Sequence, residues 1–161
     1  MVTVEPAEPA DAAQVADFWV SLASGQRRYG SHIRAEASRE PIRERMARAA
    51  ADGRLDVARA AATLVGFVRY GIERGPLVQD AVRGRVHDLY VVPEQRGSGV
   101  GTALLDAAET ALRDRGADVI SVEAMADNED AIRLYERRGY RPDRITLEQE
   151  VENDKRSRGD G

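Results

Sequence analysis

The fold is decided by residues 88–101, which read DLYVVPEQRGSGVG. The apolar run in this stretch, which a proline ends, is typical of a buried strand. Three glycines at alternate positions, Gly97, Gly99 and Gly101, predict a tight loop, because glycine adopts backbone angles that other residues avoid. Apolar residues then recur at helical spacing from Leu104 to Leu112, so the stretch predicts a strand, a glycine loop and a helix.

A loop of this kind presents the unpaired backbone N–H groups of a helix N-terminus, where the helix dipole also favours an anion. It predicts a site for a phosphate-bearing ligand, while the glycines alone also fit an ordinary strand-to-helix turn. Two known phosphate loops do not match. No Gly-Lys-Ser/Thr follows, as a nucleotide P-loop requires, and Thr102 or Leu104 stands where the dinucleotide fingerprint has its third glycine.

Further segments extend the pattern. Residues 128–140, which read NEDAIRLYERRGY, follow a predicted strand at Val119–Ala124. Together with DLYVVP at residues 88–93 and RGSGVG at residues 96–101, they resemble the GNAT superfamily of N-acetyltransferases. In that superfamily a Q/R-x-x-G-x-G/A loop grips the pyrophosphate of acetyl-coenzyme A (acetyl-CoA), and an N-x-x-A-x-x-L-Y-E-x-x-G-F/Y segment follows at this spacing.

The resemblance implies acetyl-CoA as the cosubstrate and assigns residues to it. Backbone N–H groups of residues 97–102 would hold the pyrophosphate, and the pantetheine arm would lie along the strand at residues 89–91. Asn128 would bond the pantetheine amides, or it would serve as a helix N-cap. The implied cofactor-binding residues are Leu89, Tyr90, Val91, Arg96, Gly97, Ser98, Gly99, Val100, Gly101, Thr102 and Asn128.

Two catalytic residues follow from the same resemblance. Tyr135 would protonate the departing thiolate, since the unperturbed pKa of a phenol, about 10, is close to that of a thiol. A packing role for this aromatic ring is the alternative. Glu123 would act as a base through water, as in the ribosomal-protein N-terminal acetyltransferases of the superfamily, although many members need no base. The competing candidates for the base are His87, Asp88 and Glu73.

The implied function is acetyl-CoA-dependent transfer of an acetyl group to a primary amine of a small molecule, peptide or protein, by direct transfer in a ternary complex. A catalytically weak acyl-CoA-binding sensor or regulatory module is the alternative. Tyr135 favours the enzyme, because a pure binder needs no acid. The residues expected to line the acceptor pocket are Gln26–Ile33 and Glu73–Val82. The identity of the amine and the preferred acyl group stay open.

The composition of the chain limits the partners and the cellular location that can be expected. The chain has 161 residues, a formal net charge of −4 and no cysteine. A nucleic-acid-binding domain is usually basic, so no nucleic-acid partner is expected. His32 and His87 lack metal-ligand spacing, so no metal is expected. The sequence has no apolar run long enough to cross a membrane and no signal peptide, so we expect a cytoplasmic protein with no membrane partner. We expect it to be a monomer or a homodimer.

The expected fold is of the α/β class, an α+β fold like that of GNAT proteins. A mixed, mostly antiparallel sheet would contain one parallel strand–helix–strand crossover, splay open beside it, and carry about four helices. Residues 1–151 would form a single domain, followed by a disordered polar tail at residues 152–161. The first helix would start with an Asp11/Gln14 capping box and stop at Gly25, and the second would be capped by Ser38. The expected strands are Val2–Glu5, Leu55–Ala60, Leu64–Tyr70, Arg83–Val92, Val119–Ala124 and Ile145–Glu150.

Overall fold

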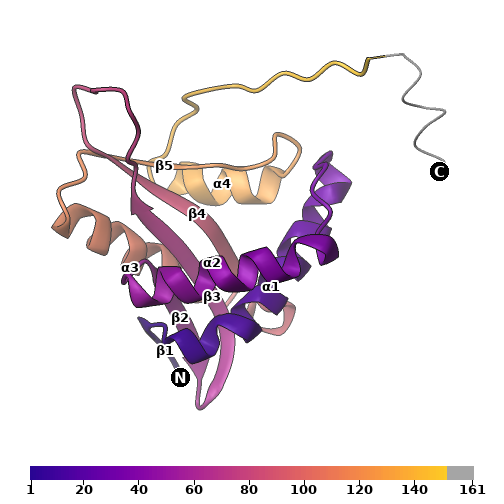
Figure 1. Ribbon diagram of the computed structural model, residues 1–161, viewed down its shortest axis with the longest axis vertical. Helices are drawn as coiled ribbons and strands as arrows, with labels where there is room; N and C mark the ends of the chain where they lie inside the picture. The colour runs from indigo at the N-terminus through magenta and orange to yellow at the C-terminus, as the bar shows by residue number, and fades with distance from the viewer. Residues whose placement is uncertain (152–161) are drawn as a thin grey trace.

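The computed structural model describes residues 1–151 and forms a mixed five-stranded sheet in the order β1-β2-β3-β4-β5. Helices cover both faces of this sheet (Figure 1). The tail predicted to be disordered, residues 152–161, lies outside the described residues. The strands are β1 (Val2–Pro6), β2 (Leu55–Ala60), β3 (Thr63–Ile72), β4 (Arg83–Val91) and β5 (Val119–Val122). The helices are α1 (Ala12–Gln26), α2 (Arg39–Ala51), α3 (Val100–Asp114) and α4 (Glu129–Arg137), with 3-10 turns at Pro9–Asp11, Arg27–Tyr29, Glu36–Ser38 and Pro93–Gln95.

The sheet confirms the predicted mixture of strand directions. β1 to β4 pair antiparallel with their neighbours, as short connections allow. β4 and β5 pair parallel, and α3 makes the crossover between them. A parallel pair needs such a long connection, which is why the strand–glycine–helix stretch fixes the topology of this half of the chain.

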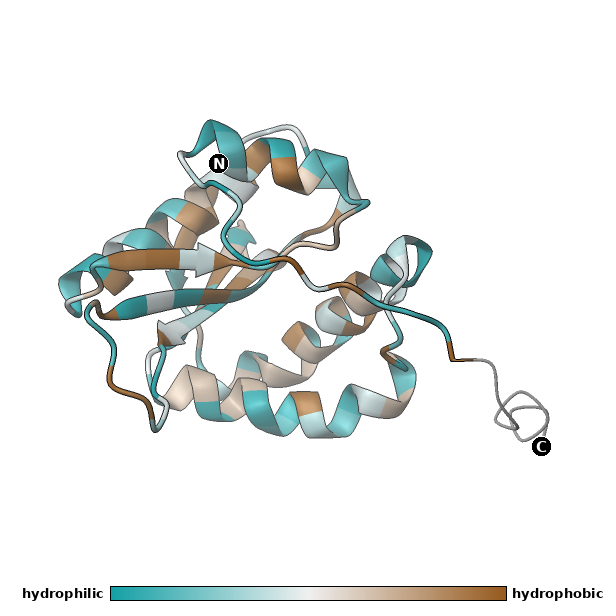
Figure 2. Ribbon diagram, turned by 90° about the horizontal axis from the view of Figure 1, so that it is seen from above, coloured by the Kyte–Doolittle hydropathy of each residue, from teal (hydrophilic) through white to brown (hydrophobic). Residues whose placement is uncertain are grey.

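Two hydrophobic clusters pack on opposite faces of the sheet. One lies under α1 and α2, where Trp19 and Met46 pack towards Phe67 of β3. The other lies under α3, whose Leu104 and Leu112 are fully buried. Figure 2 shows the sheet between the two helix layers, with hydrophobic residues on the strands and also on the helices. In the part of the chain that the structure describes, no helix is long and apolar enough to cross a membrane, and no group of side chains is arranged to hold a metal ion.

The ends of α1 differ from the prediction. The capping box joins Glu8 and Asp11, with Glu8 N donating to Asp11 Oδ2 at 2.9 Å, so the Asp11/Gln14 box is wrong. α1 also continues through Gly25 into the turn at Arg27–Tyr29, which ends at Gly30 with a φ of 98°. A glycine ends a helix only where the chain takes a left-handed conformation, and Gly30 does so in place of Gly25.

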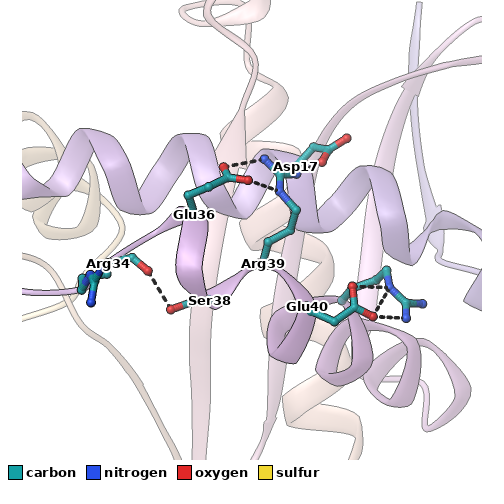
Figure 3. A network of polar contacts seen from close by, with 7 residues as sticks. Asp17, Arg34, Glu36, Ser38, Arg39 and Glu40 are labelled. Atoms are coloured by element: carbon teal, nitrogen blue, oxygen red, sulfur yellow. Dashed lines mark hydrogen bonds and ion pairs between the residues drawn. The ribbon is translucent and has the colours of Figure 1, made fainter.

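Ion pairs on the surface join the start of α2 to α1 (Figure 3). Arg39 pairs with Asp17 of α1 and with Glu36, at 2.8 Å from Arg39 Nε to Glu36 Oε1. Arg43 pairs with Glu40 one turn earlier. These exposed pairs are worth little energy singly, but they neutralise the arginines of this end of the helix.

Ser38 occupies the predicted N-cap position of α2 but makes no capping bond, because its hydroxyl donates to Arg34 O at 2.8 Å.

The predicted strand at Ile145–Glu150 is wrong. The segment extends away from the sheet without pairing to a strand, and Ile145 and Leu147 are 80% and 89% exposed. Alternating apolar residues form a strand only where a neighbouring edge buries one face, and this segment has no such neighbour among the described residues.

Candidate active site

The glycine loop leaves open space at the N-terminus of α3. Gly99 is the N-cap of α3 with a φ of 90°, and Gly97 also has a positive φ, of 79°. No atom lies within 4 Å of the position that a Cβ would take at either residue. The first N–H groups of a helix have no partner within the helix, so those of Val100, Gly101 and Thr102 face this space. A phosphate group therefore fits the loop, at the positive end of the helix dipole.

Side chains hold the loop in place. Arg96 Nε donates to Val91 O at 2.9 Å, and its guanidinium lies 5.5 Å from the centroid of the Tyr90 ring. Ser98 Oγ donates to Gln95 O at 2.5 Å. These contacts tie the loop back onto the end of β4, and the exposed guanidinium of Arg96 is placed where an anion on the loop can meet it.

The gap between β4 and β5 is the second feature of the site. The two strands pair only from Arg83 to Val86 and from Val119 to Val122, so β4 continues without a partner on that side. Val92 N donates to Val65 O, and residues of a strand direct their backbone groups to alternate sides. The backbone groups of Leu89 and Val91 therefore face the gap, while Tyr90 turns its own towards β3 and packs its ring against Phe18 and Phe67.

A β-bulge lies where the two strands part. Arg69 of β3 is opposite Asp88, and the next residue, Tyr70, is opposite Val86, so His87 is an extra residue in β4. A bulge bends its strand and increases the local twist. The bend falls where β5 ends, and it accounts for the separation of β4 from β5 beyond this point.

Asn128 and Tyr135 are both on α4. Asn128 is the N-cap, and its Oδ1 accepts a hydrogen bond from Ala131 N at 3.2 Å, which leaves its Nδ2 group for another partner. Tyr135 packs into the cluster under α3, with its ring 5.9 Å from that of Tyr140 in an edge arrangement. Burial raises the pKa of the Tyr135 phenol, so the hydroxyl keeps its proton at neutral pH. Its hydroxyl bonds to no other residue within 1–151.

A buried carboxylate joins α4 to α3. Glu109 of α3 is 5% exposed and accepts hydrogen bonds from Arg138 Nη2 at 2.6 Å and from the Tyr140 hydroxyl at 2.8 Å. Burial and the hydrogen bond to Glu109 raise the pKa of Tyr140, which keeps the donor protonated. The same helix therefore carries the glycine loop at its start and fixes the end of the helix that bears Tyr135.

We expect Glu109→Gln to lower the free energy of unfolding by about 3 kcal/mol, the lower end of the cost of removing one partner from a buried ion pair. The substitution leaves Arg138 with Asp106 as its remaining partner. Urea denaturation measures the effect. Asp114→Asn, at the exposed end of α3, is the control and is expected to change stability by less than about 0.5 kcal/mol. Equal effects of the two substitutions on stability would contradict the role of Glu109 in joining α4 to α3.

A hollow of about 620 Å³, here called the larger hollow, lies beside the bulge. Glu123 comes just after β5, and its 84% exposed side chain accepts a hydrogen bond from Arg85 Nη1 at 2.9 Å. Arg85 also pairs with Glu73 at 3.2 Å, so one arginine stands between two carboxylates. The larger hollow is lined by Arg54, Gly71, Ile72, Glu73, Arg74, Arg85, His87 and Glu123.

The candidates for the base separate into two groups. Glu123, Glu73 and His87 meet at the larger hollow, whereas Asp88 bonds to Arg69 at 2.8 Å and is only 14% exposed. Desolvation lowers the pKa of His87, with the charge of Arg69 acting in the same direction, so the imidazole is neutral near pH 7. A neutral imidazole is able to accept a proton, and it lies beside the carboxylates.

Sequence reasoning missed the arginines of this region. Arg85 links Glu73 to Glu123, which is 38 residues further along the chain. The only signal was the alternation along β4, which puts Arg83 and Arg85 on the same side of the strand. The predicted acceptor segment at Gln26–Ile33 does not line the larger hollow, and of the segment at Glu73–Val82 only its first two residues do.

The arrangement of glycine loop, splayed strands and bulge defines a known class of fold. The family model of the acetyltransferase (GNAT) family matches residues 13–140. The chain belongs to this family.

Curated relatives match shorter parts of the chain. A mycothiol acetyltransferase from Propionibacterium freudenreichii subsp. shermanii is 38% identical over 105 residues, which cover 63% of this chain and 32% of that protein. N-alpha-acetyltransferase 30 of Schizosaccharomyces pombe is 41% identical over 59 residues, covering 37% of this chain and 39% of the relative. The chain thus spans about a third of the length of such relatives.

Solved structures match over nearly the whole chain. A GCN5-related N-acetyltransferase from Ralstonia eutropha has a TM-score of 0.75 at 24% identity, with 92% of this chain and 98% of that chain covered. A ribosomal-protein-alanine N-acetyltransferase from Brucella melitensis has a TM-score of 0.64 at 25% identity, with 94% and 100% covered. The fold of this chain is therefore that of the GNAT proteins.

Proposed function

We propose that the protein transfers the acetyl group of acetyl-CoA to a primary amine of a small molecule or peptide. One observation carries the proposal: the unpaired edge of β4 leads from the glycine loop to the larger hollow, where Glu123 and His87 lie. An extended ligand anchored by its phosphates on the loop would run along that edge, and its thioester end would reach the bulge. Holding both reactants in this way makes the reaction effectively intramolecular.

The residues of the chain have separate roles in this transfer. Acetyl-CoA supplies the acetyl group as a thioester, and a C–N bond to the amine forms as the C–S bond breaks. A backbone N–H that faces the gap near Val91, that of Leu89 or Val91 itself, donates a hydrogen bond to the thioester oxygen as negative charge develops there. Tyr135 gives its proton to the departing thiolate. The proton released by the amine passes to Glu123 through water, or to the neutral His87.

A sensor or regulatory module that binds acyl-CoA without efficient transfer is the second candidate. Either function would use the glycine loop and the gap. The position of Tyr135 favours the enzyme, because its hydroxyl, whose pKa is raised by desolvation, keeps a proton at neutral pH and bonds to no other described residue. Release of free thiol in the presence of an amine separates the two functions.

Acetyl-CoA and CoA are both expected to raise the melting temperature, and nicotinamide dinucleotides are not. A ligand that binds only the native state at 100 times its dissociation constant stabilises by about 2.7 kcal/mol. Differential scanning fluorimetry measures the shift, and a panel of primary amines with thiol detection then tests transfer. Stabilisation by the dinucleotides without stabilisation by CoA would overturn the assignment of the loop.

A further inference from the structure

A second, smaller hollow of about 230 Å³ is lined entirely by arginines. It is here called the arginine hollow and is formed by Arg45, Arg48, Arg54 and Arg69. Three parts of the chain contribute to it: α2, the turn before β2, and β3. Guanidinium groups repel one another, so a hollow with this lining favours an anionic occupant.

The arginines of α2 differ in their partners. Arg39 and Arg43, at the start of the helix, are neutralised by carboxylates (Figure 3). Arg45 and Arg48, three residues apart on the same helix, form no ion pair with any residue in the described range 1–151. Their positive charges are therefore available to a ligand.

The other two arginines of the hollow are only partly neutralised. Arg54 lies 3.1 Å from Asp52, and Arg69 lies 2.8 Å from Asp88. Four arginines thus line the hollow, and two of them pair with carboxylates. The whole chain has a formal net charge of −4, so the local excess of positive charge is opposite in sign to that of the molecule.

The arginine hollow adjoins the larger hollow, because Arg54 lines both. A molecule with its amine beside Glu123 would extend past Arg54 towards Arg45 and Arg48. Arg74, which also lines the larger hollow and forms no ion pair within the described residues, adds positive charge along the way. Together the two hollows have the size of a small-molecule site.

The phosphates of CoA itself are not the expected occupant. Within the sheet, Arg69 is opposite Asp88 and Gly71 is opposite Arg85, so the hollows lie level with residues 85–88 of β4. The glycine loop follows the end of β4 at Val91. The two anion sites are thus separated along the strand.

We propose that the acetyl acceptor is a small primary amine that carries an anionic group, a carboxylate or a phosphate. The anion binds Arg45, Arg48 and Arg54, and this fixes the amine beside Glu123 and His87. The inference rests on the proposed acetyl transfer and adds the substrate class to it. Charged hydrogen bonds of about 1.5–3 kcal/mol each correspond to a preference of roughly 10- to 100-fold per contact.

Matched amines test the substrate class. 5-Aminopentanoate, pentylamine and 1,5-diaminopentane have the same chain length and differ in the terminal group, and O-phosphoethanolamine with ethanolamine forms the corresponding phosphate pair. We expect an anionic amine to exceed its neutral and cationic counterparts at least tenfold in kcat/KM. The set of three and the phosphate pair also distinguish a carboxylate from a phosphate as the preferred anion. Equal rates for all members of both sets would overturn the proposal.

The double substitution Arg45→Gln with Arg48→Gln tests the location. It is expected to raise KM for the preferred anionic amine tenfold or more and to leave KM for acetyl-CoA unchanged. Arg43→Gln with Arg133→Gln changes the net charge equally at arginines outside both hollows and serves as the control. A loss in the control equal to that in the double variant would show a general effect of charge and overturn the assignment.

Calorimetry with O-phosphoethanolamine and 5-aminopentanoate, in the presence of CoA, separates failure of this inference from failure of the proposed function. Binding that the double variant loses, without acetylation of any amine, would contradict acetyl transfer and support the anion site. Acetylation of neutral amines as efficiently as of anionic ones would support the transfer and overturn the anion site.

Discussion

Gly101→Val is expected to abolish measurable binding of acetyl-CoA while the protein stays folded. Gly101 has no positive φ, and a Cβ there would meet only Val91 Cγ2, at an ordinary distance of 3.7 Å. Valine is therefore tolerated by the protein, and its branched side chain is expected to narrow the space at the N-terminus of α3 where the pyrophosphate would bind. Loss of several hydrogen bonds to a charged pyrophosphate weakens binding by roughly 100-fold or more. Isothermal titration calorimetry with CoA and a melting curve measure the two effects.

Gly99→Val is a harsher companion substitution, because the φ of 90° at Gly99 adds strain of about 1–3 kcal/mol to any effect on the ligand. Gly116, which has a φ of 96° just beyond the end of α3, provides the control for strain. Gly116→Val is expected to lower stability to a similar extent and to keep CoA affinity. Unchanged CoA affinity in a folded Gly101→Val protein would place the phosphates elsewhere.

Tyr135→Phe is expected to lower turnover by about 100-fold, the low end of general-acid contributions, because a thiolate is a fair leaving group. The substitution removes only the hydroxyl, so the contact of this ring with Tyr140 and the affinity for acetyl-CoA are retained. Steady-state kinetics with an accepted amine and calorimetry with acetyl-CoA separate turnover from binding.

Tyr140→Phe is the matched control, since it removes the same atom from the neighbouring ring. It breaks the hydrogen bond to Glu109, so it is expected to reduce stability by about 1–3 kcal/mol and to leave turnover within a few-fold of the original. Wild-type turnover in Tyr135→Phe would show that Tyr135 is a packing residue, and the acid would have to be sought elsewhere.

The parts of the structure that the sequence predicts are those with local causes. The loop at Gly97 and Gly99 follows from backbone angles that few other residues adopt, and the strand before it and the helix after it follow from their periodicity. The mixed sheet follows because a helical crossover produces parallel strands and short connections produce antiparallel ones. Each of these signals lies within a short stretch of chain.

The parts that the sequence does not predict depend on distant partners. Ile145–Glu150 has the alternation of a strand, but no edge in the described chain pairs with it. Gly25 resembles a helix stop, but the chain takes the left-handed conformation only at Gly30, so the helix continues past Gly25. The pairing of Arg85 with Glu123 and the gathering of arginines from α2 and β3 depend on the register of the folded sheet, which single-sequence patterns leave undetermined.

Glu109 bonds the end of α4 to α3, and as a result the residues proposed for the acetyl donor and those proposed for the amine lie in different parts of the chain. The residues proposed to bind acetyl-CoA lie on or next to α3. The helix α4, which carries Tyr135, is joined to α3 through the hydrogen bonds of Glu109. The arginine hollow, by contrast, is formed by four arginines between positions 45 and 69, which precede α3 in the chain. Substitutions that redirect the choice of amine can therefore accumulate in α2, the following turn and β3 without disturbing the machinery that delivers the acetyl group.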